Sequence, residues 1–114
     1  MSGAAMQARL WRWQRWSAIV LAACVLLHIA GMILAVRGGL SAAEILARTR
    51  GNWLAGGFYA VFVAACAVHA PIGMMNIARE WWSWRAGLVA PLAALFAAAL
   101  LALGLLAIAG LVLP

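Results

Sequence analysis

Three apolar runs, each long enough to cross a bilayer, are the feature of this sequence that most limits its fold. They cover about residues 17–36, 53–78 and 87–113. A helix needs about 20 predominantly apolar residues to span the hydrocarbon core. Because the lipid interior offers no hydrogen-bond partners to an exposed backbone, such segments cross it as helices. The sequence therefore predicts an all-α, integral membrane three-helix bundle, with residues 1–114 forming a single transmembrane domain.

The composition excludes a soluble domain and most self-contained enzymes. Apolar residues make up 69% of the chain and charged residues only 9%, whereas a soluble domain has about a quarter of its residues charged. The charged residues are eight arginines and two glutamates, which gives a net charge of +6. In so apolar a chain, clustered arginine indicates orientation and lipid headgroup contact rather than binding of nucleic acid. Without any aspartate, the chain has too few polar groups for a hydrolytic or phosphoryl-transfer site.

The connection between the first two runs contains the signals of a short helix. Ser41 and Glu44 have the spacing of a capping box, in which each residue satisfies a backbone N–H of the other. Gly51 and Asn52 follow as a helix stop. The sequence thus predicts a short interfacial helix over about residues 42–48.

Aromatic residues mark the ends of the predicted spans. All seven tryptophans lie near a span end, the level at which an indole meets the lipid headgroups. They are Trp11, Trp13, Trp16, Trp53, Trp81, Trp82 and Trp84. Tyr59 is interpreted in the same way. We expect the first run to be a permanent span rather than a signal peptide, because it ends at Arg37 without a small-residue cleavage site.

Arginine counting predicts the orientation. One side of the membrane would hold five arginines and the other side three. The five are Arg9, Arg12, Arg15, Arg79 and Arg85, and the three are Arg37, Arg48 and Arg50. Because arginine accumulates on the cytoplasmic side, we expect a multi-pass protein of the cell inner (cytoplasmic) membrane with a cytoplasmic N-terminus.

Two histidines lie inside the predicted spans, His28 in the first and His69 in the second. Ionisable groups at membrane depth are costly and commonly mark functional sites. His28 follows Ser17 by eleven residues, and His69 precedes Arg79 by ten. At a rise of 1.5 Å per residue, both imidazoles would lie about 15 Å from the same membrane face. We therefore expect them at one depth on facing helices.

This arrangement favours a haem b whose iron is bound by His28 and His69. A neutral imidazole is the usual axial ligand of such a haem, and helix bundles build cofactor sites between facing helices. The alternative is that each histidine hydrogen-bonds a backbone carbonyl or a nearby serine across a helix interface. A proton relay is less favoured because neither glutamate lies deep in a span.

Two short segments resemble a known family. Residues 69–82, HAPIGMMNIAREWW, resemble the second-helix motif of succinate dehydrogenase and fumarate reductase membrane anchor subunits. That motif has a haem-ligand histidine, a glycine four residues on, and an acidic residue followed by an aromatic at the cytoplasmic helix end. Residues 15–21, RWSAIVL, look like the start of the first helix of the smaller anchor subunit.

The resemblance implies a haem b bound by His69 and a quinone bound near the cytoplasmic face. Glu80 and Trp81 occupy the places of the acidic residue and of a tyrosine that donates a hydrogen bond at the quinone site. Trp81 departs from the family here, because an indole N–H donates but does not ionise. Ser17 and Arg15 are further expected contacts to the quinone or to a partner subunit.

The resemblance also implies partners. The chain would be a non-catalytic subunit of an oxidoreductase, receiving electrons from an iron–sulfur subunit that a flavoprotein reduces. It would pair with a second membrane anchor chain or a second copy of itself. His28 departs from the single-haem anchors, whose other ligand lies on the partner, and is closer to the two-haem anchors, which carry a histidine on their first helix.

Three other functions stay open. A cytochrome b subunit of another membrane dehydrogenase or hydrogenase would share the haem but not the partner enzyme. A structural assembly subunit would hold no cofactor. A small multidrug-type transporter is disfavoured because that class needs four spans and a membrane-embedded carboxylate.

Overall fold

The computed structural model describes residues 3–82 and 86–114, which form four α-helices and no strand. Three are long: α1 (Gly3–Gly38), α3 (Trp53–Trp81) and α4 (Ala86–Val112). α2 (Ala42–Thr49) is short. All three long helices are apolar enough to cross a membrane. The predicted all-α three-span architecture is confirmed, and the chain fits a multi-pass membrane protein. Trp84 and Arg85 lie outside the described residues.

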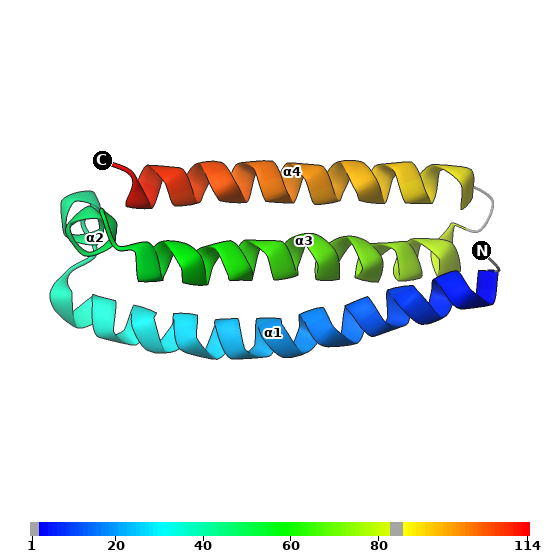
Figure 1. The fold of residues 1–114 in the computed structure, drawn as a ribbon, viewed down its shortest axis with the longest axis horizontal. Helices are drawn as coiled ribbons and strands as arrows, with labels where there is room; N and C mark the ends of the chain where they lie inside the picture. The colour runs from blue at the N-terminus through cyan, green and yellow to red at the C-terminus, as the bar shows by residue number, and fades with distance from the viewer. Residues whose placement is uncertain (1–2, 83–85) are drawn as a thin grey trace.

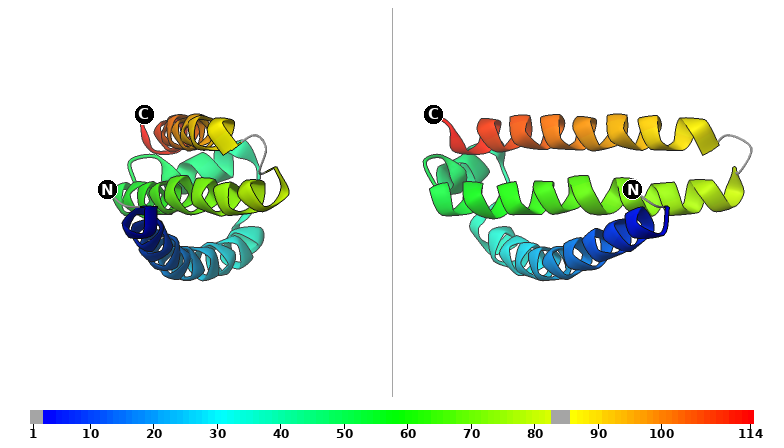
Figure 2. Two further views of the ribbon diagram at one scale, coloured as in Figure 1. Left: turned by 90° about the vertical axis from the view of Figure 1, so that its right-hand side faces the viewer. Right: turned by 45° about the vertical axis from the view of Figure 1, so that its right-hand side comes forward.

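The long helices lie side by side with α3 in the middle (Figure 1). α3 packs against α1 on one side and α4 on the other, and α2 contacts α4. Figure 2 shows the same order in two further views, with α1 bowed along its length. The N-terminus lies near the end of α3, and the C-terminus lies near α2. The arginine-rich start of α1 therefore shares one end of the bundle with Arg79.

The predicted interfacial helix is confirmed as α2. The Ser41 hydroxyl accepts from the Glu44 N–H at 3.2 Å, and the Glu44 carboxylate accepts from the Ser41 N–H at 2.9 Å. Hydrogen bonds to the Glu44 carboxylate from the Ser41 side chain and backbone lower the pKa of Glu44, because they favour the charged carboxylate. Gly51 follows the helix with a φ of 71°, a backbone conformation that glycine adopts without strain.

α1 begins at Gly3, well before the predicted span start at Ser17. The segment before Ser17 contains no proline, and between Ala4 and Trp16 it contains no glycine. It is rich in alanine, arginine and other good helix formers, so nothing ends the helix there. The tryptophan and arginine side chains of this segment consequently stand on a continuous helix rather than on a flexible tail.

Small residues set the contact between α3 and α4. A Cβ atom at Gly56 would lie 3.3 Å from Val112 Cγ2, and one at Gly104 would lie 2.5 Å from Val63 Cγ1. Ala93 of α4 is buried as well. Glycine and alanine let helix backbones approach closely, which drives association where no hydrophobic effect acts.

The apolar runs of the two outer helices are displaced along the bundle. Contacts across α3 place residues 17–36 of α1 opposite roughly residues 50–69 of α3. Residues 87–112 of α4 lie opposite roughly residues 56–80. The centres of the two runs thus differ by about 12 Å along the axis. Neighbouring helix axes are 8–10 Å apart, and the two outer helices are separated by two such spacings. A tilt of the whole bundle by roughly 30° therefore brings both runs to the same depth in the membrane. This tilt lies within the range of transmembrane helices.

A tilted bundle makes a testable prediction about depth. Nitroxide labels on Trp16→Cys and on Leu88→Cys, each in a chain with Cys24 and Cys66 replaced by alanine, are expected at equal depth in vesicles. An upright bundle would instead bury the label at residue 16 deeper by about 15 Å, from the helical rise. Oxygen and nickel accessibility of the two labels by electron paramagnetic resonance separates these results.

Candidate functional site

The His69 imidazole lies at the interface between α1 and α3. Its Nδ1 is 3.3 Å from Oγ of Ser17, which is buried. The Ser17 hydroxyl donates its one proton to the backbone carbonyl of Gln14, at 3.1 Å. In the tautomer with the proton on Nδ1, the imidazole donates to Ser17 Oγ, which leaves the Ser17 proton for the Gln14 carbonyl. A neutral imidazole of this tautomer keeps its lone pair on Nε2.

The Nε2 atom of His69 is free to bind a ligand from outside the chain. It has no hydrogen-bond partner among the described residues. Nε2 is not among the buried polar atoms that lack a partner, and the His69 side chain is half-buried, so Nε2 is accessible from outside the chain. A hydrogen bond from Nδ1–H is the usual way in which a protein orients a metal-binding imidazole and raises its basicity. The site thus has the donor chemistry expected of an axial haem ligand.

Gln14 is the member of this site that the sequence reasoning missed. Its Oε1 is buried without a hydrogen-bond partner within residues 3–82 and 86–114. Its Nε2 lies 3.3 Å from where a Cβ at Gly73 would stand, so glycine makes room for the amide. Its spacing of three residues from Ser17 could have indicated that Gln14 belongs to the site. The tryptophans and arginines around Gln14 instead favoured the interpretation that this segment contacts the lipid headgroups.

His28 forms a separate site with Tyr59. Its Nδ1 lies 3.2 Å from the Tyr59 hydroxyl, and its ring meets those of Tyr59 and Phe62 edge-on, with centroids 5.7 Å apart in each pair. This contact was not expected from the sequence, which interpreted Tyr59 only as an interfacial aromatic. This residue contacts a histidine between α1 and α3.

The expectation that both imidazoles lie at one depth is wrong. His69 faces Ser17, whereas His28 faces Tyr59, ten residues earlier on α3 than His69. The two imidazoles are thus about 15 Å apart along the bundle. This separation is too large for both imidazoles of one chain to bind the same iron. The cause is the helical extension of α1, which brings the residues near Gln7, rather than Ser17, opposite Arg79.

The residues expected to contact a quinone do not form one group. Ser17 is buried against His69, whereas Arg15 is exposed with its guanidinium 5.2 Å from the centre of the Trp11 ring. Glu80 is exposed, and Trp81 ends α3 with 75% of its surface exposed. Arg15 lies level with about residue 71 of α3, about 13 Å along the axis from Glu80. A quinone contact made by these four side chains together is not assembled within this chain.

Other metal-binding groups are few. Within residues 3–82 and 86–114, no cluster of three or more histidine, cysteine or acidic side chains is placed to hold a metal ion. Cys24 and Cys66 are free thiols, the first buried and the second half-buried. His69 and His28 therefore remain the two candidate ligands, each at its own level.

Comparison of the chain with known proteins finds no match. No protein-family model, no curated protein and no solved structure is similar to it. The membrane fold accordingly rests on the helices described above. The function is argued from the His69 site and from the motif in residues 69–82.

Proposed function

We propose that the chain is the membrane anchor subunit of a succinate:quinone oxidoreductase-like complex and binds haem b through His69 Nε2. The observation that supports this most is the hydrogen-bond chain from His69 through Ser17 to Gln14, which suits the tautomer with Nδ1 protonated and the lone pair on Nε2. When bound, haem b accepts and passes on single electrons. The chain itself contributes the ligand, its orientation and an apolar surround.

The second axial ligand would come from another chain. His28 is too distant along the bundle, and Tyr59 already contacts its Nδ1. His69 is only half-buried, so its free edge faces the outside of this three-helix unit. A second membrane anchor chain or a second copy of this chain would complete the iron site and cover this edge.

The iron–sulfur subunit, with its flavoprotein, would dock at the arginine-rich end of the bundle, on the cytoplasmic side. Arg9, Arg12 and Arg15 are exposed on the N-terminal part of α1, and of the three Arg9 lies nearest in level to the end of α3 that carries Arg79 and Glu80. The excess of arginine there supports a cytoplasmic N-terminus in the cell inner membrane. A quinone reduced at this end would contact Glu80 or Trp81 together with side chains of the partner subunit.

One observation favours a cofactor-free assembly subunit instead. Both histidines already have hydrogen-bond partners between α1 and α3, as expected of polar residues that join helices in a membrane. A cytochrome b subunit of another dehydrogenase or hydrogenase would in turn show haem without succinate-dependent reduction.

The test is a reduced-minus-oxidised optical spectrum of the complex purified from native membranes. We expect a b-type α band, its appearance on addition of succinate, and copurification of a flavoprotein and an iron–sulfur subunit. A complex without the band contradicts the haem proposal. A band that dithionite but not succinate produces, without a flavoprotein of this kind, supports another cytochrome b.

A further inference from the structure

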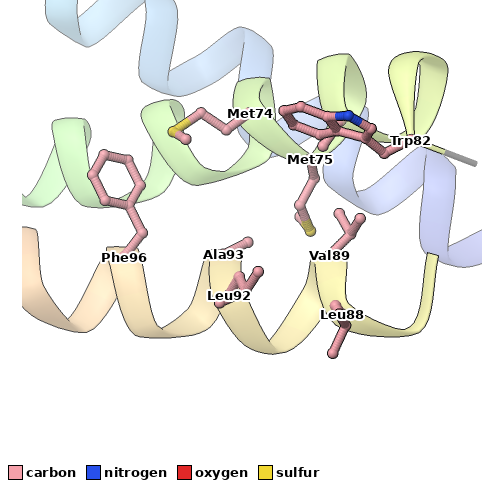
Figure 3. A pocket seen from close by; sticks show the side chains of 9 residues that line it. Met74, Met75, Trp82, Leu88, Val89, Leu92, Ala93 and Phe96 are labelled. Atoms are coloured by element: carbon pink, nitrogen blue, oxygen red, sulfur yellow. The ribbon is translucent and has the colours of Figure 1, made fainter. Parts of the chain in front are cut away.

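An apolar pocket lies between α3 and α4, on the side of α3 away from the contact with α1. Its volume is about 550 Å³. Figure 3 shows Met75 of α3 pointing toward Val89 of α4, with Trp82 near one end of the pocket and Phe96 near the other. The lining side chains are apolar, apart from the indole N–H of Trp82.

The pocket runs along the bundle, from the arginine-rich helix end toward the membrane interior. Its lining extends over nine residues of each segment, from Trp82, just past the end of α3, to Met74, and from Leu88 to Phe96 on α4. This length corresponds to about 12 Å along the axis. Met74, Trp82 and Leu88 are each a little more than half exposed, so the pocket opens sideways to the surrounding lipid.

A cation stands at the headgroup end of this pocket. Arg79 follows Met75 by one helical turn and lies at the edge of the face of α3 that lines the pocket. Arg79 is exposed, and no side chain among the described residues pairs with it. Glu80 is its immediate neighbour in sequence, and adjacent residues on a helix point in different directions. Arginine in this position suits a phosphate, which accepts two hydrogen bonds from its planar guanidinium.

We propose that this pocket binds one acyl chain of an anionic phospholipid, whose phosphate is bound by Arg79. An acyl chain needs no hydrogen-bond partner, which matches the apolar lining. Inside the lining, a quinone head would find a single donor, the Trp82 N–H, for its two carbonyl oxygens, because Arg79 stands at the end of the pocket, and an unpaired buried oxygen is costly. Basic pockets between transmembrane helices on the cytoplasmic side commonly bind anionic lipid headgroups. The site is independent of His69 and of the proposed haem.

The test is native mass spectrometry of the full chain with its copurifying partners. The probes are phosphatidylglycerol and phosphatidylcholine with identical acyl chains, added to delipidated protein. We expect tighter binding of phosphatidylglycerol. Arg79→Gln should weaken that binding by about fivefold, from one lost arginine–headgroup interaction, and leave phosphatidylcholine unchanged. Ala78→Phe should fill the pocket and reduce the binding of both lipids.

Arg37→Gln is the matched control, because Arg37 is an exposed arginine at the opposite end of the bundle. It should leave binding of phosphatidylglycerol unchanged. Equal affinity for the two lipids, or equal losses in Arg79→Gln and Arg37→Gln, would overturn the proposal. Displacement of phosphatidylglycerol by ubiquinone at equal concentration would overturn it as well. Arg79→Gln changes only an exposed side chain, so its result stands even if Ala78→Phe does not fold.

Discussion

His69→Ala is expected to abolish the b-type α band of the purified complex. Alanine removes the Nε2 lone pair that the Ser17 contact leaves free for iron. The distant His28 does not replace it, since His28 faces Tyr59 about 15 Å away along the bundle. The measurement is the reduced-minus-oxidised spectrum, together with the haem content per chain by pyridine haemochrome.

His28→Ala is the matched control for this experiment. It removes the other membrane-embedded imidazole and its hydrogen bond to Tyr59, but it should leave the α band in place. A band that survives His69→Ala would exclude His69 as a required ligand. Equal losses in the two variants would point to a general failure of folding or to a haem that needs both histidines.

Ser17→Ala separates a ligand from the residue that orients it. Ser17 acts through His69, so the band should persist while haem affinity falls by about 10- to 100-fold, as for other residues that support a metal ligand. The haem midpoint potential should rise, because an imidazole without an acceptor for Nδ1–H donates less electron density to iron. A Ser17→Thr variant keeps the hydroxyl and should restore both values. An unchanged potential in Ser17→Ala would mean that the contact is structural.

Several parts of the fold follow from local sequence patterns. The three apolar runs predict the three long helices, because bilayer thickness sets their length independently of tertiary contacts. The capping pair Ser41 and Glu44 predicts the start of α2, since both bonds form within four residues. Such features need no knowledge of how the helices pack.

The relative depth of the histidines depends on packing and did not follow from the sequence. Counting residues from Ser17 and from Arg79 assumed that charged flanks mark one membrane plane. The register between α1 and α3 instead matches the side-chain contacts between the two helices. Ser17 contacts His69, and the Gln14 amide lies next to Gly73. These contacts join residues more than fifty positions apart, and no local pattern indicates them. Gln14 was missed for the same reason.

The pocket between α3 and α4 was equally hidden from the sequence. Met75, Trp82 and Phe96 each have an ordinary reading as core or interfacial residues. Only their placement around one opening forms the pocket, whereas Gly56 and Gly104 lie close to the facing helix elsewhere. A pocket of this kind is a property of two helix surfaces together.

Gly104→Ala is expected to lower the free energy of unfolding of the bundle by about 1–3 kcal/mol, the usual cost of forcing a methyl group into a packed contact. The added Cβ would stand 2.5 Å from Val63 Cγ1 and 2.8 Å from Val63 Cγ2, closer than these atoms approach in proteins. Val63 is β-branched and stiff at χ1, so it has little freedom to move aside. The measurement is unfolding of the detergent-solubilised chain by sodium dodecyl sulfate, followed by circular dichroism and tryptophan fluorescence.

Gly110→Ala on the same helix isolates the steric part of this effect. A Cβ at Gly110 would have no atom within 4 Å, so this variant should gain only the helix preference of alanine over glycine. Both variants share that gain, and their difference therefore reports the clash at Gly104. Adding Val63→Ala to Gly104→Ala removes both Cγ atoms and should recover most of the loss, which would identify Val63 as the group that fixes the α3–α4 distance. Equal stability of Gly104→Ala and Gly110→Ala would mean that α3 and α4 are not held together at this contact.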